Sequence, residues 1–345
     1  MVSFDIVIMA REKLMTIISF IVPTYNSERT IDVCLKSIRN QQFDQNEIEI
    51  VLVDGGSIDK TLEISNNYNV NILKNLKKDH PVGRPLGIRK SKGIFVCLLD
   101  SDNILVSNDW LKKMMIPFSN KNVIAAEPLN YEYQNDDNLI TKYCSLIGGD
   151  DPIIVQLGFS DKYSHLIDNW TLVPRFEKKH NGWIEVNFKN SQNIPSIGAN
   201  GTIVKRDYLE SINIDPFYHI DVCQKLITNN KLRSWAKVNI GIRHLHSDTL
   251  SKFIKKKQRR LARRVNEADI GYIYPIKKTS VLIIILKSIL IVPILIDSFY
   301  GYKKAKSLVW IIHPLLHYIT LFLYIYYGSV KLFYKSKKMK SYENV

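Results

Sequence analysis

The chain has 345 residues, 46% of them hydrophobic, and a formal net charge of +15 at pH 7. This composition excludes a globally disordered chain, and the length allows one large domain with appendages or two domains. The charge is unevenly distributed, because residues 1–251 are neutral and residues 252–345 carry the whole excess. We therefore expect a charge-balanced globular part with a basic tail, and a nucleic-acid-binding protein is disfavoured.

The first hundred or so residues alternate between apolar runs and amphipathic segments. The apolar runs predict four strands, at residues 17–22, 48–53, 70–73 and 94–99. Between them, the spacing of apolar side chains predicts helices, and a turn with a short helix is expected at residues 83–91. Strands that alternate with helices are typical of an α/β fold with a Rossmann-like, mostly parallel sheet flanked by helices.

Three polar motifs stand where these apolar runs end. They comprise Pro23, Thr24, Tyr25 and Asn26; Asp54, Gly55, Gly56 and Ser57; and Asp100, Ser101 and Asp102. Open α/β sheets bind ligands at the carboxyl ends of their strands. Two carboxylates one residue apart suit a hard divalent cation that also holds phosphate oxygens. The motifs therefore indicate an enzyme that handles a nucleotide diphosphate.

In order and spacing, these motifs resemble the nucleotide-sugar-binding half of inverting family 2 glycosyltransferases, which have the GT-A fold. The resemblance extends over residues 23–102 and also includes Asp59, Thr61, Gly83, Arg84, Gly87 and Gly93. It implies an enzyme that uses a divalent metal and transfers a sugar from a UDP- or GDP-linked donor. One departure is Pro85, because the family usually has asparagine after the arginine.

The resemblance implies roles for several of these residues. Asp54 would contact a uracil or guanine base, and the glycines after it would let the backbone approach the nucleotide. Arg84 would pair with the diphosphate. Asp102, together with Asp100, would hold Mg²⁺ or Mn²⁺. The alternatives are that Asp54 forms a turn, that Arg84 is a surface arginine, and that Asp59 is a helix cap rather than a nucleotide contact.

The second half of the expected catalytic domain has fewer readable motifs. The turn that contains Gly198 and Asn200 resembles a family motif that lies against the donor sugar and diphosphate. Asp221 stands where the family has its general base, although Ile220 replaces the family's neighbouring glutamate. His219 is a rival base, since the reference pKa of histidine is about 6.5.

Two histidines follow an expected strand at residues 236–242, and alternation puts His244 and His246 on the same face. Family members often have a histidine here that meets the diphosphate or the metal. His246 is slightly favoured as a metal ligand because a turn follows it. Asp150 and Asp151 precede a proline, so they are interpreted as a turn rather than as another metal site.

The tail has apolar segments at residues 280–299 and 307–328, each about long enough to cross a bilayer. They predict a transmembrane hairpin or two interfacial helices, and buried core helices remain an alternative. Lys287 lies within the first segment and needs an ionic partner or access to the interface. The basic run at residues 255–264 suits anionic lipid headgroups.

The predicted organisation is a catalytic domain followed by a membrane-associated helical tail. The parts are a GT-A domain at 1–250, with a nucleotide-sugar half at 15–125 and an acceptor half at 126–250; a basic juxtamembrane segment at 251–278; two transmembrane or interfacial helices at 279–329; and a basic tail at 330–345. The expected reaction is transfer to a hydroxyl of a lipid-linked glycan at the cytoplasmic face of a membrane. A polyprenyl-phosphate sugar synthase is the first alternative, and a nucleotidyltransferase is the second.

Overall fold

The computed structural model describes residues 16–342, with gaps at 76–79, 232 and 267–273. The described residues form two compact units. The sheet unit lies within Met1–Tyr133 and Leu172–Leu245, and the helical unit lies within Gln134–Thr171 and His246–Val345. This division differs from the expected boundary at residue 250, because Gln134–Thr171 groups with the C-terminal helices and not with the sheet.

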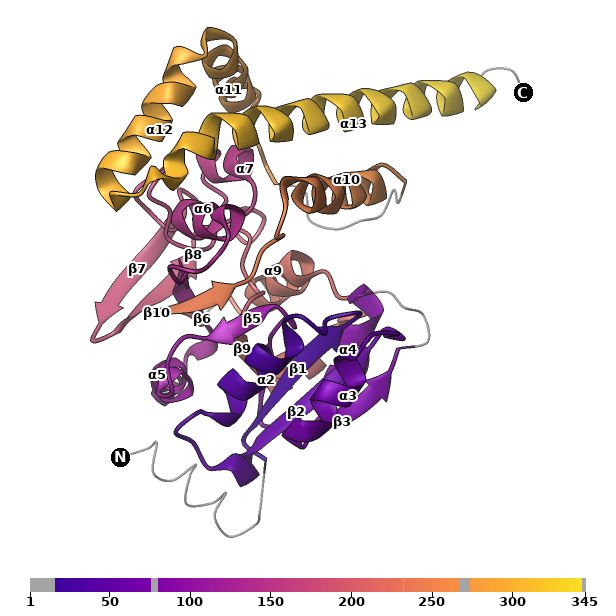
Figure 1. The fold of residues 1–345 in the computed structure, drawn as a ribbon, viewed down its shortest axis with the longest axis vertical. Helices are drawn as coiled ribbons and strands as arrows, with labels where there is room; N and C mark the ends of the chain where they lie inside the picture. Colours follow the sequence, from indigo (N-terminus) through magenta and orange to yellow (C-terminus); the bar gives the residue numbers. More distant parts are fainter. Residues whose placement is uncertain (1–15, 76–79, 232, 267–273, 343–345) are drawn as a thin grey trace. The chain divides into compact units, whose positions relative to one another are not determined.

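The first half of the sheet unit contains the four predicted strands. They are β1 (Ile18–Thr24), β2 (Ile48–Asp54), β3 (Asn71–Lys74) and β4 (Phe95–Leu98). The helices between them are α2 (Ile31–Arg39), α3 (Thr61–Ser65) and α4 (His80–Lys90), with short 3₁₀ turns at Gln45–Glu47 and Asn66–Tyr68. The four strands are parallel and lie in the order β3-β2-β1-β4, which confirms this part of the prediction. Strands β1, β2 and β3 lie side by side in Figure 1.

Burial explains why the sequence revealed these strands. Every residue of β1 is buried, and a strand covered on both faces has a continuous run of apolar side chains. The apolar positions of α2 are buried as well, and they are Ile31, Cys34, Leu35 and Ile38. The sheet and this helix therefore share one core.

Helix α4 begins earlier than expected, so Gly83 and Arg84 lie in a helix and not in a turn. Pro85 is inside the same helix. A Cβ atom added to Gly87 would lie 2.6 Å from Cγ2 of Ile21, which is closer than real atoms approach. Glycine at this position thus lets the helix pack tightly on the sheet, and this packing outweighs the weak helix propensity of glycine and proline.

The second half of the sheet is mixed. Its strands are β5 (Asn103–Leu105), β6 (Val123–Glu132), β7 (Arg175–His180), β8 (Trp183–Phe188), β9 (Thr202–Lys205) and β10 (Ser234–His244). They continue the sheet from β4 in the order β9-β6-β10-β8-β7, with β5 beside β10. β6 and β10 are parallel, but β9 is antiparallel to both β4 and β6. The helices of this half are α5 (Trp110–Met115), α8 (Arg206–Glu210) and α9 (His219–Asn229), and a 3₁₀ turn spans Ile116–Ser119.

The helical unit contains the apolar tail. Its elements are α6 (Leu139–Ile147), α7 (Pro152–Gln156), α10 (Leu250–Asn266), α11 (Lys278–Leu290), α12 (Val292–Ala305), a 3₁₀ turn at Leu308–Ile312 and α13 (His313–Tyr342). Within the described residues, one unbroken stretch, Leu308–Val330, is long and apolar enough to cross a membrane by length and composition, with a mean hydropathy of 1.8. The helices α11 and α12 pass the same test only when they are taken together as one bent span.

The first apolar segment, expected as one helix, is broken into α11 and α12. The two helices meet at a bend of 93°, where Ile291 has a φ of 60°. Pro293 stands in the first turn of α12, a position where proline favours the start of a new helix. The Lys287 ammonium lies 3.6 Å from Oδ2 of Asp297, so the lysine within the segment has the ionic partner that it needs.

Candidate active site

The first two predicted motifs bond to each other at the ends of β1 and β2. The backbone N–H of Gly55 donates to the carbonyl of Thr24 at 2.8 Å. The N–H of Ile58 donates to Oδ1 of Asn26 at 3.0 Å, and the N–H of Asn26 donates to Oγ of Ser57 at 2.9 Å. Asn26 has a φ of 48°, a conformation that asparagine adopts more readily than most residues. These hydrogen bonds hold the loop after β1 against the loop after β2.

Three other residues of these motifs have distinct surroundings. Pro23 lies within β1 opposite Val53, whereas the side chain of Tyr25 is exposed. Thr24 is buried, and its Oγ1 atom has no hydrogen-bond partner among the described residues. Because buried polar atoms normally have partners, this hydroxyl is a candidate ligand contact.

Asp54 and Asp59 stabilise the loops that contain them. The Asp54 carboxylate is buried and accepts hydrogen bonds from the N–H of Gly56 at 2.9 Å and from Oγ of Ser57 at 2.6 Å. Asp59 accepts a hydrogen bond from the N–H of Thr61 at 3.0 Å, at the start of α3. Asp54 therefore has the turn role that the sequence left open, whereas the N-cap of α3 is Lys60 and Asp59 bonds to the first residue of the helix. Contacts of either aspartate with a nucleotide stay predictions.

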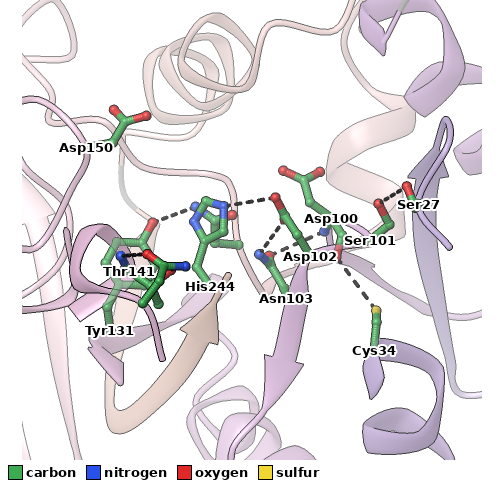
Figure 2. Close-up of polar contacts among 12 residues, drawn as sticks. Ser27, Cys34, Asp100, Ser101, Asp102, Asn103, Tyr131, Thr141, Asp150 and His244 are labelled. Carbon is green, nitrogen blue, oxygen red and sulfur yellow. Dashed lines mark hydrogen bonds and ion pairs between the residues drawn. The ribbon is translucent and has the colours of Figure 1, made fainter. Parts of the chain in front are cut away.

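The Asp100–Ser101–Asp102 motif directs its side chains to different partners (Figure 2). Oδ1 of Asp100 accepts a hydrogen bond from Nη2 of Arg84, and the two groups form an ion pair. The hydroxyl of Ser101 lies 2.9 Å from that of Ser27, which follows the first motif. The third strand-end motif is thus connected to the first.

Asp102 lies beside a histidine from a distant part of the chain. Its Oδ2 atom is 3.4 Å from Nε2 of His244, and its Oδ1 atom accepts a hydrogen bond from Nδ2 of Asn103 at 3.1 Å (Figure 2). The backbone explains this meeting, because β5 pairs antiparallel with β10 and Asn103 lies opposite His244. The N–H of Leu245 also donates to the carbonyl of Asp102 at 2.8 Å. His246, which the sequence slightly favoured, belongs to the helical unit, and its role stays a prediction.

Arg84 is a buried residue, so its interpretation as a surface arginine is wrong. It is 4% exposed, and its guanidinium lies 5.7 Å from the ring centroid of Phe217. Its Nε atom has no hydrogen-bond partner among the described residues. The side chain therefore keeps one buried donor for a ligand while it pairs with Asp100.

The predicted glycine turn lies against the end of β4. Gly198, Asn200 and Gly201 have φ values of 97°, 51° and 87°, which explains the choice of glycine and asparagine. The N–H of Gly201 donates to the carbonyl of Leu98 at 2.8 Å. Nδ2 of Asn200 donates to the hydroxyl of Tyr131 at 2.6 Å, and its Oδ1 atom is buried without a partner among the described residues.

Asp221 lies in the first turn of α9, which packs on this glycine turn. A Cβ atom on Gly198 would lie 2.2 Å from Sγ of Cys223 and 3.2 Å from the carbonyl of His219. Phe217, just before the helix, stacks on Arg84. The helix with Asp221 thus contacts the glycine turn, and a residue just before the helix contacts Arg84. The general-base role of Asp221 stays a prediction.

The donor atoms at the site fit a divalent cation. Asp102 and His244 supply one carboxylate and one imidazole, and Mg²⁺ is commonly held by one or two protein groups with substrate phosphates. In the part of the chain that the structure describes, no three His, Cys, Asp or Glu side chains form a ready-made metal cluster. Such a site would need oxygens from the nucleotide diphosphate to complete it.

Asp150 and Asp151 form an ionic cluster in the helical unit. Asp151 caps α7, because its Oδ1 atom accepts hydrogen bonds from two backbone N–H groups, as the turn interpretation implied. Its Oδ2 atom lies 3.0 Å from Nζ of Lys257, and Asp150 pairs with Arg260. Burial opposes ionisation of Asp150, but the charges of Arg260 and Lys257 outweigh it and hold its pKa well below the usual range. Two cations of the basic run are therefore neutralised within the unit.

Sheets of this kind bind nucleotides along the edge where their parallel strands end, and here that edge holds both aspartates of the third motif. Fold and site together define an α/β protein with polar side chains at the edge where such folds bind nucleotides. The family model described as Glycosyl transferase family 2 matches residues 19–190, and the chain belongs to this family. The predicted family and fold class are confirmed.

Known proteins resemble parts of this chain. A stretch of 107 residues is 36% identical to an uncharacterized glycosyltransferase of Haemophilus influenzae and covers 29% of this chain and 42% of that protein. A stretch of 131 residues is 29% identical to the UDP-Glc:alpha-D-GlcNAc-diphosphoundecaprenol beta-1,3-glucosyltransferase WfgD of Escherichia coli and covers 37% of this chain and 50% of that protein. Each match thus spans half or less of the relative's length.

Among solved structures, the mannosyltransferase PcManGT from Pyrobaculum calidifontis, in complex with GDP-Man and Mn²⁺, has a similar fold. Its TM-score is 0.51 and its sequence identity is 13%, over 90% of this chain and 86% of that chain. The likeness supports the GT-A assignment of the fold.

Proposed function

We propose that this protein is an inverting, metal-dependent glycosyltransferase that moves a sugar from a UDP- or GDP-linked donor to a lipid-linked acceptor. The observation that carries the proposal is the meeting of Asp102 with His244 beside the Asp100–Arg84 pair. These groups stand at the edge of the sheet where nucleotides bind in such folds. The family membership of the chain supports the same activity.

Buried polar atoms at this edge support a bound donor. The hydroxyl of Thr24, Nε of Arg84 and Oδ1 of Asn200 have no hydrogen-bond partners among the described residues. Leaving such atoms unpaired costs free energy, so a ligand with phosphate, hydroxyl and amide groups would stabilise the site. A nucleotide sugar carries all of these groups.

Asp102 and His244 would hold Mg²⁺ or Mn²⁺ together with diphosphate oxygens of the donor. The cation, when bound, would neutralise charge on the leaving diphosphate. Arg84 would add a fixed positive charge at the same edge, where negative charge develops during transfer. Asp100 would keep the guanidinium of Arg84 oriented.

Asp221 is the proposed general base. It would accept the proton of the attacking hydroxyl, an effect that is typically worth about 10²–10⁴-fold in rate. The packing of α9 on the turn with Gly198 supports a position near the donor. An ionised phosphate acceptor would need no base, so a requirement for Asp221 also distinguishes a glycan acceptor from a polyprenyl phosphate.

The helical unit supports a membrane-associated acceptor. Many apolar side chains of α11 and α12 are exposed, and a large exposed apolar surface is typical of a membrane or protein interaction site. The name of the relative WfgD specifies a diphosphoundecaprenol-linked acceptor. Basic residues flank the apolar helices, which favours a catalytic domain on the cytoplasmic face and contact with anionic lipids.

Calorimetric titration with UDP- and GDP-sugars tests the donor part of the proposal. We expect one nucleotide class to bind, with an affinity at least about tenfold higher in Mn²⁺ than in EDTA, because the ion bridges protein and diphosphate. Mass spectrometry of lipid products from a panel of acceptors would then identify the transferred sugar. Absence of binding to every donor in the presence of Mn²⁺ would contradict the proposal.

A further inference from the structure

The helical unit contains an apolar groove with a volume of about 610 Å³, lined by side chains of α7, α11, α13 and the residues beside them. The lining includes Ile154 of α7, Ile285 and Ile289 of α11, and Phe322 and Ile325 of α13. The volume lies in the range of about 300–1,000 Å³ that is usual for pockets that bind small molecules. The groove is therefore large enough for a substantial length of hydrocarbon chain.

Two hydroxyl groups of the groove, those of Ser288 and Tyr318, bond to other groups of the helical unit. The hydroxyl of Tyr318 donates to the carbonyl of Ser288 at 2.7 Å. The hydroxyl of Ser288 bonds to the carbonyl of Ile284 at 2.8 Å and lies 2.9 Å from Nε2 of His317. The donor hydrogens of these two hydroxyls are used within the protein, and most of the lining side chains are apolar, so the lining favours an apolar ligand.

The groove borders on a charged cluster. Tyr324 lines the groove, and its hydroxyl donates to Oδ2 of Asp151 at 2.8 Å. The same oxygen pairs with Lys257 of α10. Lys255 and Arg259 are exposed on this helix, and α10 packs on α13. The helix that carries these cations therefore packs on a helix that lines the groove, and this arrangement suits a ligand with a hydrocarbon chain and an anionic end.

We propose that this groove holds the hydrocarbon chain of the lipid-linked acceptor, with the phosphate end of the lipid toward the cations of α10. This inference rests on the proposed function, which requires a lipid-linked substrate. The groove is continuous with exposed apolar faces of α11 and α13, and α13 contains most of the stretch that is long and apolar enough to cross a membrane. The chain could thus enter the groove from a bilayer.

Shape, more than hydrophobicity, would select this chain over ordinary membrane lipids. Within a bilayer, lipid tails are as apolar as leucine side chains, so burial alone gives no preference for either. A concave groove makes close contacts only with a chain that fits it. If the proposal is correct, lipids with the same type of chain should compete with the acceptor for the groove. Bulk phospholipid should not compete.

Photolabelling tests this requirement without sugar transfer. The probe is a polyprenyl phosphate with a diazirine in its chain, added to the full-length protein in phosphatidylglycerol vesicles. Mass spectrometry should find the label on peptides of α7, α11 and α13 that line the groove. Unlabelled polyprenyl phosphate should remove this label, and the same molar excess of added phosphatidylglycerol should not. Equal competition by both lipids, or label spread over all exposed apolar faces, would overturn the proposal.

A groove-filling variant tests the role of the groove in catalysis. Ile285 lines the groove and is 42% exposed, whereas its neighbour Leu286 is 49% exposed and lies outside the lining. Ile285→Trp should raise the KM for a long-chain acceptor about tenfold, because it overfills the groove. The kcat, the KM for a short-chain acceptor and the KM for the donor should not change. Leu286→Trp is the matched control and should behave as the unaltered protein does.

The outcomes separate this inference from the proposed function. Equal KM changes for long-chain and short-chain acceptors, or no change in Ile285→Trp, would refute the groove as the chain site while transfer itself continues. Transfer to no lipid-linked acceptor would contradict the proposed function, and the photolabelling result would still decide whether the groove binds the chain. Unfolding midpoints of both variants should match that of the unaltered protein, since both positions are exposed.

Discussion

The two units of this protein distribute polar and apolar side chains in opposite ways. In the sheet unit strands such as β1 and β4 are buried throughout, and polar residues gather where the parallel strands end. In the helical unit the charged residues pair with each other, as Lys257 with Asp151 and Lys287 with Asp297, and many apolar side chains are exposed. The sheet unit thus presents polar groups at its strand ends, and the helical unit presents an exposed apolar surface of the kind that is typical of a membrane or protein interaction site.

The largest expected effect concerns the metal site. Asp102→Ala should lower sugar transfer by about 10³-fold or more, because charge on the leaving diphosphate would no longer be neutralised. Release of UDP or GDP from the donor measures the effect, and excess EDTA should reproduce it. Asp109→Ala, which removes an exposed carboxylate of the same unit, is the control. Normal activity in Asp102→Ala would remove this residue from the site.

A smaller loss is expected at the proposed base. Asp221→Asn should lower transfer to a hydroxyl acceptor by about 10²-fold or more, since the amide cannot take up the proton. Donor affinity, measured by calorimetry, should stay the same. Unchanged turnover with a polyprenyl phosphate acceptor would instead favour the synthase alternative.

Substitution of the two histidines compares the units directly, because His244 belongs to the sheet unit and His246 to the helical unit. His244→Ala should lower activity by about 10–100-fold, as substitutions close to a metal commonly do. His246→Ala should have the smaller effect, because the contact with Asp102 is made by His244 in the sheet unit. Activity measured across Mn²⁺ concentrations would show whether added metal rescues either variant. A larger loss of activity in His246→Ala than in His244→Ala would instead favour His246 as the metal ligand, as the sequence did.

The smallest effect concerns stability of the helical unit. Lys257→Met should lower the free energy of unfolding by about 1–3 kcal/mol, because Asp150 and Asp151 lose one of their partners. Lys255→Met, on the exposed side of the same helix, should change it by no more than about 0.5 kcal/mol. Unfolding in detergent, followed by circular dichroism, measures both. Donor binding should persist in the two variants, since the proposed donor site lies in the sheet unit.

The sequence predicted the first half of the fold well, because its signals are local. Strands buried on both faces appear as apolar runs, and each motif directly follows its strand. The antiparallel insertion of β9 between β4 and β6 was not predicted, since it joins segments that are distant in the chain. The bend at Ile291 was not predicted for another reason. Hydropathy shows that a segment is long and apolar, but it does not show where the helix changes direction.

The sequence by itself determined the family, the parallel half of the sheet and the aspartates at its edge, since all of these depend on neighbours in the chain. Only the tertiary structure decided that His244 meets Asp102, because that contact requires β5 to pair with β10. It also decided that Gln134–Thr171 belongs with the C-terminal helices, where Asp150 and Asp151 pair with α10. Pairing between distant segments depends on packing and charge in three dimensions, and no local pattern records it.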